Sequence, residues 1–199
     1  MDANPPTPRQ LAPASVRSHP IADRVPFVHF RAPIGFYMAH RAFTVDQANA
    51  MIPQLEKTLR QLGEKKEALE QQRSQLQILE VLWGDKITQT NNPDHGEFVQ
   101  HTQKVALLMR QIKTQIDREV LSQGLRFPAG DLERGPIDFP TTYQGRWVYL
   151  CWERGEDEII YWHELDAGRQ GRQRLEPSHH TTMGQRQDPA LLDDSMLDF

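Results

Sequence analysis

The sequence contains very little cysteine: the single thiol among its 199 residues is Cys151, which excludes an intramolecular disulfide framework and a metal cluster built from cysteines alone. It also lacks an apolar run approaching the ~18–20 residues of a transmembrane helix, and its N-terminus lacks the apolar segment of a signal peptide. Basic side chains are not in excess, with 23 Lys and Arg against 27 Asp and Glu, which disfavours nucleic-acid binding. These absences predict a soluble, cytoplasmic protein that has neither nucleic acid nor a membrane as a partner.

Apolar residues are also scarce, at 38% of the chain, because both ends of the sequence are poor in core-forming side chains. Residues 1–42 contain seven of the 14 prolines and residues 176–199 are acidic, so we expect both segments to be disordered. Met38 stands just before the first strong structural signal, which suggests the hypothesis that translation starts there. The intact mass of the native protein tests this hypothesis.

Residues 43–123 carry the pattern of two long helices. Thr44 and Gln47 match a capping box at the start of the first helix, and Pro53 should kink or restart it. One apolar residue then recurs every seven positions and forms a narrow, coiled-coil-like seam: Leu55, Leu62, Leu69, Leu76 and Trp83.

A break at residues 84–96 separates the two helices. Asp94 with Glu97 three residues later predicts a second capping box, and Gly124 predicts the end of the second helix. Because each apolar stripe needs a covering surface, we expect an antiparallel helical hairpin.

Residues 124–175 have a different character, because aromatic and β-branched residues concentrate there. They predict three antiparallel strands, at 137–143, 147–153 and 158–164. The fold class is therefore α+β: a long antiparallel helical hairpin followed by a small three-stranded antiparallel sheet packed on the helices.

A tight turn at Gly155 and Glu156 would fix how the second and third strands pair. It places Trp152 opposite Ile159 and Val148 opposite His163, and it puts Cys151 and His163 on opposite faces. Both faces of this hairpin are apolar, so we expect both to be covered, one by the helices and the other by loops, the final segment or a second subunit.

Several short motifs in the helical and strand regions occur together. They are Phe43-Thr44-Val45, Ala48-Asn49-Ala50, Pro53, Asp138-Phe139-Pro140, Leu150-Cys151-Trp152, Gly155-Glu156 and Tyr161-Trp162-His163-Glu164. Over residues 43–175 this pattern resembles a bacterial family catalogued as domain of unknown function 2203. Two positions depart from the family pattern, Pro136 in place of an apolar residue and Arg169 in place of an aromatic one. The resemblance implies no activity, because none is assigned to the family.

One group of polar side chains lies beside the aromatic strands and is the candidate binding site. Its members are His163, Glu164, Asp138, Glu156 and Arg172. In the functional interpretation His163 acts as an acid–base group or ligand and a carboxylate from another strand or loop, preferably Asp138, orients it. In the conservative interpretation His163 is a partly buried structural histidine and the acids and arginines form surface ion pairs.

Metal and cofactor sites are not expected. A zinc site would need Cys151 and His163 together, and the predicted register separates them; Cys151 is then simply a small buried hydrophobic residue. The sequence has no Gly-rich phosphate loop or nucleophile motif, so we predict no cofactor and identify no catalytic residues.

These observations favour a non-enzymatic, self-associating interaction module, a homodimer built on the helical seam and the aromatic hairpin. The alternative is a small-molecule-binding or hydrolytic protein with a polar pocket around His163. The acidic segment from Leu191 to Phe199 mixes bulky apolar residues with acids, a composition of short motifs that dock on a protein partner and also of solvated tails.

Overall fold

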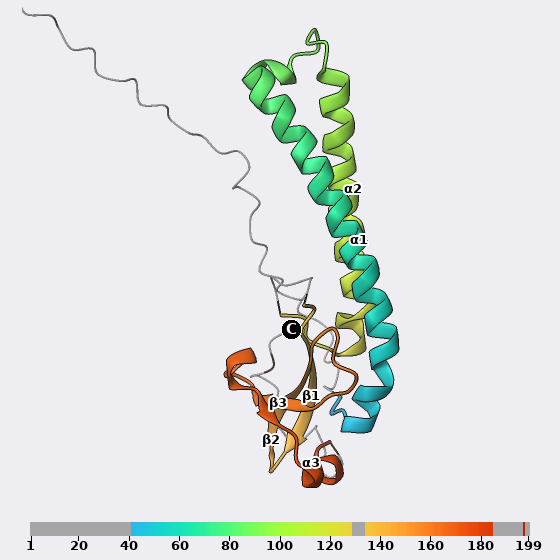
Figure 1. Cartoon of the computed structure of the whole chain (residues 1–199), viewed down its shortest axis with the longest axis vertical. Coiled ribbons are helices and arrows are strands. Elements are labelled where there is room, and N and C mark those ends of the chain that lie inside the picture. Colours follow the sequence, from blue (N-terminus) through green and yellow to red (C-terminus); the bar gives the residue numbers. More distant parts are fainter. Residues whose placement is uncertain (1–40, 129–133, 185–196, 198–199) are drawn as a thin grey trace, which may run out of the picture. The chain divides into compact units, whose positions relative to one another are not determined.

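The computed structural model describes residues 41–128, 134–184 and 197. Two long helices come first and a four-stranded sheet follows (Figure 1). The elements are α1 (Val45–Trp83), η2 (Gly84–Thr88), α2 (His95–Glu119), η3 (Leu121–Gln123), β1 (Ile137–Tyr143), β2 (Arg146–Trp152), β3 (Tyr161–Glu164), η4 (Arg169–Gly171), β4 (Gln173–Arg174) and α3 (Pro177–Thr182). The predicted class, α+β with a helical hairpin, is confirmed, with one more strand than expected.

The hairpin begins with the predicted capping box. The Gln47 N–H donates to Thr44 Oγ1 at 3.2 Å and the Thr44 N–H donates to Gln47 Oε1 at 3.4 Å, so both ends of the reciprocal cap are present. Helix α1 runs through Pro53 without a break, so the helix does not restart there. In the described part of the chain no helix is long and apolar enough to cross a membrane.

The second predicted capping box is wrong. Asp94 stands at the N-cap of α2 but makes no side-chain cap bond. Its Oδ2 instead accepts a hydrogen bond of 2.7 Å from Trp83 Nε1 at the end of α1. The carboxylate therefore ties the two helices together across their turn, a use that local spacing does not distinguish from capping.

The sheet is antiparallel with the strand order β1-β2-β3-β4. The outer edge of β1 is held by Arg126, whose backbone exchanges two hydrogen bonds of 2.9 Å with Asp138, and by Phe43, whose N–H donates to the Pro140 carbonyl at 2.8 Å. Because Asp138 and Pro140 are two residues apart, the N–H that proline lacks belongs to this outer edge and not to the β1–β2 ladder.

The main core lies between one face of the sheet and the first half of α1. It contains Ile52, Leu55, Leu59 and Leu62 of the helix together with Ile137, Phe139, Val148, Leu150, Trp152 and Trp162 of the strands. On the other face Trp147 and Tyr149 pack with Leu197 and, partly buried, Ala42 and Leu165. Both faces are thus covered, as the apolar sequence on both sides predicts.

The end of the described chain differs from the prediction of a disordered segment from residue 176 onward. Residues 177–182 form the short helix α3, and His179 and Met183 are buried. The Gly184 N–H donates to the Thr142 carbonyl at 3.1 Å, which joins this segment to β1. The expected disorder of residues 1–40, 185–196 and 198–199 lies outside the described residues.

A polar network joins α1 to α2 inside the hairpin. Glu119 accepts hydrogen bonds from Thr58 Oγ1 at 2.9 Å, from Gln115 Nε2 at 3.0 Å and from Arg118 Nη2 at 2.6 Å. The hydrogen bond from Gln115 and the neighbouring Arg118 and Thr58 outweigh the opposing effect of burial and lower the pKa of Glu119 to about 2.

We expect this network to destabilise the fold in acid. Because the folded pKa of Glu119 lies below its ordinary value of 4.5, its stabilising contribution is present above pH 4.5 and is lost as the pH falls towards about 2. Urea unfolding between about pH 5 and about pH 3 should show a smaller loss of stability for Glu119→Gln than for the unmodified chain. Equal losses in both proteins would assign the acid sensitivity to other groups.

Trp152 anchors the core and allows a second test of the fold. Its ring is fully buried and its Nε1 donates to the Glu156 carbonyl at 2.8 Å. Trp152→Ala should lower the free energy of unfolding by about 3–5 kcal/mol, the usual loss for truncating a buried large aromatic residue. The exposed Leu82, changed to Ala, is the control and should change stability by less than about 0.5 kcal/mol. A comparable small effect for Trp152→Ala would contradict the core described above.

Candidate functional site

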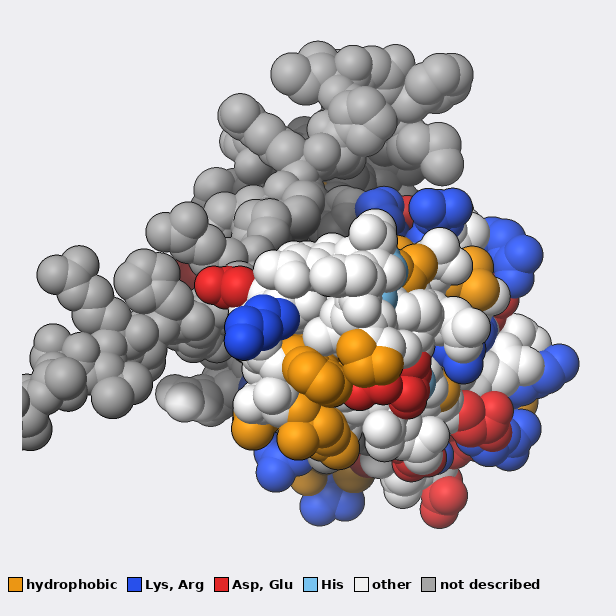
Figure 2. Space-filling model, turned by 90° about the horizontal axis from the view of Figure 1, so that it is seen from above, with side chains coloured by type: hydrophobic (Ala, Val, Ile, Leu, Met, Phe, Trp, Pro, Cys, Tyr) orange, Lys and Arg blue, Asp and Glu red, His pale blue; other side chains and the backbone are white. Residues whose placement is uncertain are grey.

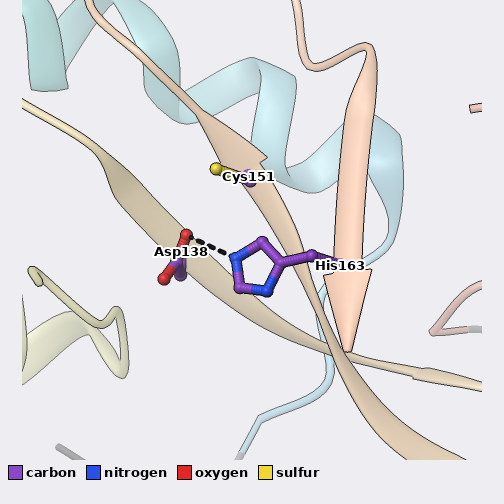
Figure 3. A group of neighbouring side chains, drawn as sticks. All are labelled: Asp138, Cys151 and His163. Carbon is purple, nitrogen blue, oxygen red and sulfur yellow. Dashed lines mark hydrogen bonds and ion pairs between the residues drawn. The ribbon is translucent and has the colours of Figure 1, made fainter. Parts of the chain in front are cut away.

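The candidate site lies on the sheet face turned away from α1. Asp138 of β1 is the direct partner of Cys151 in β2, and His163 of β3 is the direct partner of Tyr149 in β2. Because side chains alternate along a strand and partners share a face, Asp138, Cys151 and His163 all point to the same side. Three neighbouring strands each contribute one of these side chains (Figure 3).

This arrangement corrects the predicted β2–β3 register. The prediction paired Val148 with His163, whereas the structure pairs Val148 with Glu164 and Tyr149 with His163. A shift of one residue moves every side chain of a strand to the other face, so Cys151 and His163 share a face and are not separated.

The physical reason for the different register is the connection between the two strands. Residues 153–160 form a loop instead of a tight turn, with β3 beginning only at Tyr161. The Glu153 N–H donates to Glu156 Oε2 at 2.8 Å, and the Ile159 N–H donates to Asn49 Oδ1 of α1 at 2.7 Å. These bonds use backbone groups that a continuous ladder would have paired.

We call Asp138, Cys151 and His163 the buried triad. One donor atom from each of the three lies within 4.8 Å of the others, and all three residues are no more than 2% exposed. His163 Nε2 lies 3.2 Å from Asp138 Oδ1, and His163 Nδ1 lies 2.8 Å from the Glu164 carbonyl oxygen. The Asp138–His163 contact is the one that the strand order predicts; the participation of Cys151 was not expected.

Arg126 completes the surroundings of Asp138. Its Nη1 lies 3.1 Å from Asp138 Oδ2, and its guanidinium stands over the Tyr149 ring at 5.2 Å from the ring centre. The two carboxylate oxygens of Asp138 therefore have different partners, His163 for Oδ1 and Arg126 for Oδ2. Sequence reasoning missed Arg126, because it precedes the strands by ten residues or more and nothing in its local pattern indicates a pairing with β1.

The electrostatics of the buried triad are set by burial and by the neighbouring Asp138. Burial lowers the pKa of His163, but the hydrogen bond and the charge of Asp138 outweigh it, so that the pKa is raised above its ordinary value. Burial also raises the pKa of the Cys151 thiol, and the charge of Asp138 raises it further. Cys151 is consequently a protonated thiol, and both ring nitrogens of His163 already have partners. This geometry is not that of a cysteine nucleophile activated by a histidine base.

Two other predicted site residues, Glu156 and Arg172, pair with each other. Arg172 Nη2 lies 2.8 and 2.7 Å from the two carboxylate oxygens of Glu156 and donates to the Cys151 carbonyl at 3.3 Å. The Arg172 guanidinium also stands over the Tyr161 ring at 4.2 Å. These contacts fasten the 153–160 loop to the sheet, which is a structural role.

The fifth predicted residue, Glu164, belongs to the other face of the sheet. It pairs with Arg146, whose Nε and Nη2 lie 3.1 and 2.7 Å from the two carboxylate oxygens. The hydrogen bond from Arg146 lowers the pKa of Glu164. Of the five predicted side chains, the structure therefore places only His163 and Asp138 at the candidate site, and it adds Cys151 and Arg126 to them.

The fold and this site define an α+β protein in which a helical hairpin supports a small antiparallel sheet with a buried Asp–Cys–His triad. The chain belongs to the family described as an uncharacterized conserved protein (DUF2203), whose family model matches residues 41–175. The resemblance seen in the sequence motifs is thereby confirmed. Searches among curated proteins and among solved structures found no match.

The two predicted carboxylates should behave differently when removed. Asp138→Ala leaves His163 buried without its partner and should cost about 3–5 kcal/mol of unfolding free energy. Glu164→Ala removes a partly exposed pair with Arg146 and should cost less than about 1 kcal/mol. Urea unfolding of both variants measures the two losses of unfolding free energy. Similar losses would show that the Asp138–His163 contact does not stabilise the fold more than the Glu164–Arg146 pair.

Proposed function

We propose that the chain is a self-associating interaction module whose contact surface lies at the end of α1. Three large apolar side chains of its last turns are exposed: Ile78 by 51%, Val81 by 80% and Leu82 by 66%. We call these three residues the tip patch. Figure 2, which looks onto the end of the hairpin, shows hydrophobic side chains gathered on this surface. The exposure of the tip patch is the observation that carries the proposal, because large contiguous apolar patches on a protein surface commonly mark a site of interaction.

Most of the heptad seam is not available to a second copy. Leu55, Leu62 and Leu69 are buried within the chain, the first two in the core shared with the sheet, and Leu76 and Trp83 are partly buried. The Leu197 side chain likewise covers Trp147 and Tyr149 on the far face of the sheet. Both features that suggested self-association in the sequence are thus satisfied inside one chain, which leaves the tip patch as the candidate contact.

A second copy of the chain is the partner that suits the tip patch. Residues spaced by three and four positions share a helix face, so Gln71, Ser74 and Gln75 precede the patch on the same side of α1. The neighbours on this side are uncharged, and the charged residues that follow the patch, Asp85 and Lys86, have opposite signs. Two copies related by a twofold axis can therefore bring the same apolar surface together with Asp85 of each copy free to approach Lys86 of the other.

The size of the tip patch predicts a weak contact. Burial of three partly exposed side chains on each of two copies contributes roughly 6–12 kcal/mol, at about 1.5–3 kcal/mol for a fully buried large apolar side chain. Loss of translational and rotational freedom costs roughly 4–15 kcal/mol. The difference is at best about 8 kcal/mol, which corresponds to a Kd no lower than about 1 µM.

Sedimentation velocity of the full chain from about 10 µM to about 1 mM tests this proposal. The weight-average mass should rise towards that of a dimer, and Val81→Glu should abolish the rise because it places a charge in the apolar contact. Gln103→Glu, at an exposed position of α2, adds the same charge outside the tip patch and should associate like the unmodified chain.

Two results would contradict the proposal. A chain that stays monomeric over the whole concentration range does not self-associate. If Val81→Glu associates as strongly as the unmodified chain, the contact lies elsewhere.

A second candidate function, ligand binding in the β region around His163, is favoured by the proximity of Asp138, Cys151 and His163. The remaining predicted site residues do not join them, so the candidate is narrowed to the buried triad. The docking role proposed for residues 191–199 concerns a segment of which only Leu197 is described, and the cytoplasmic location stays a prediction from the sequence.

A further inference from the structure

We propose that Asp138, Cys151 and His163 bind one divalent metal ion, with Zn²⁺ as the preferred ion. The inference rests on three different ligand types, a carboxylate oxygen, a sulfur and an imidazole nitrogen, gathered within 4.8 Å in the interior of the sheet. It is independent of the proposed self-association, which concerns the tip patch.

The sheet register holds the three ligands in place. Asp138 and Cys151 are direct partners on adjacent strands, where Cβ atoms stand about 4.5–5.5 Å apart. His163 lies on the third strand, β3, and points to the same face. Its direct partner on β2 is Tyr149, two residues before Cys151. Ligands carried on three hydrogen-bonded strands need little rearrangement to surround one ion, which is the condition for a preorganised site.

The orientation of His163 is that of a metal ligand. Its Nδ1–H donates to the Glu164 carbonyl at 2.8 Å, which directs Nε2 towards Asp138 and Cys151. A backbone carbonyl that accepts from the second ring nitrogen is the usual way in which proteins fix the tautomer of a ligating histidine.

Asp138 is suited to donate a single oxygen. Its Oδ1 faces His163, while Oδ2 is held by Arg126 at 3.1 Å. Arg126 would therefore remain outside the ligand set as a positioning residue and keep the carboxylate in place. In Figure 3 the three side chains converge on one region between their strands.

The ligand set selects the ion. Ca²⁺ and Mg²⁺ are bound mainly by oxygen ligands, whereas a thiolate and an imidazole suit Zn²⁺ and related late first-row ions. Zn²⁺ with three protein ligands keeps a fourth tetrahedral position for water or another group. A dication with one thiolate, one carboxylate and one neutral imidazole has no net charge, so its burial avoids the large cost of an isolated ion.

Binding requires a defined release of protons. The Cys151 thiol loses its proton to solvent and becomes the ligating thiolate, and any proton shared between His163 Nε2 and Asp138 Oδ1 is also released, because the metal ion takes its place. No bond other than these ligand bonds forms and no oxidation state changes.

Cobalt titration of the full chain, previously dialysed against a chelator, tests the proposal. Co²⁺ replaces Zn²⁺ in tetrahedral sites, and a thiolate ligand gives it a charge-transfer absorption in the near ultraviolet. Because the chain has a single cysteine, this absorption would identify Cys151 without any variant. We expect the absorption to saturate at one Co²⁺ per chain and to disappear when Zn²⁺ is added, and we expect Zn²⁺ to raise the Tm.

Variants locate the other two ligands. Arg126→Gln should weaken Co²⁺ binding about 10–100-fold, as is typical of losing an outer-shell partner. Asp138→Asn and His163→Gln should each weaken Co²⁺ binding by more than this. The control is His180→Gln on α3, which removes an exposed histidine outside the buried triad and should bind Co²⁺ like the unmodified chain.

The proposal is overturned if the unmodified chain shows no thiolate absorption, if it saturates at one Co²⁺ per two chains, or if both Asp138→Asn and His163→Gln bind Co²⁺ with unchanged affinity. If either variant does not fold, the absorption and stoichiometry of the unmodified chain decide alone. If the chain is monomeric but shows the expected Co²⁺ absorption, the proposed self-association is refuted and the proposed metal site is supported.

Discussion

The pairing of Tyr149 with His163 is the constraint on which both faces of the sheet depend. With this register Val148, Leu150 and Trp162 point into the core shared with α1, and His163 joins Asp138 and Cys151 on the opposite face. The alternative register would place His163 towards the helices and Trp162 away from them. Since a one-residue shift exchanges whole faces, the sheet cannot adjust one side chain at a time.

The loop between β2 and β3 maintains that register. Glu156 makes three contacts there. Its carbonyl accepts a hydrogen bond from Trp152 Nε1, and its carboxylate accepts one from the Glu153 N–H and also pairs with Arg172. Arg172 in turn donates to the Cys151 carbonyl. The acid and the arginine therefore act on the buried triad through the backbone, by holding the strand that carries Cys151, and not as members of the site.

Sequence reasoning reaches the elements of this fold more readily than their pairing. The cap at Thr44 and the spacing of the apolar residues define α1, because helix signals are local. The β2–β3 register is not local: both faces of these strands are apolar, so alternation cannot tell one register from the next, and the loop is fixed by Asn49 from α1. For the same reason the sequence predicts the contact between Asp138 and His163 but places Cys151 on the opposite face. The contact from Arg126 to Asp138 cannot be predicted before the neighbour of β1 at its outer edge is known.

The two proposed activities lie in different parts of the molecule, the buried triad in the sheet and the tip patch at the end of α1. Core contacts between α1 and the sheet end at Leu62, whereas the tip patch begins 16 residues later at Ile78, about 24 Å further along the helix at 1.5 Å per residue. Substitutions that far apart, with no shared partners, normally act additively. A charge at Val81 should therefore leave the buried triad intact, and removal of a triad ligand should leave the tip patch exposed. Any coupling between metal binding and self-association would have to pass along α1 and its contacts with α2, which include the polar network of Thr58, Gln115 and Glu119 beside the core.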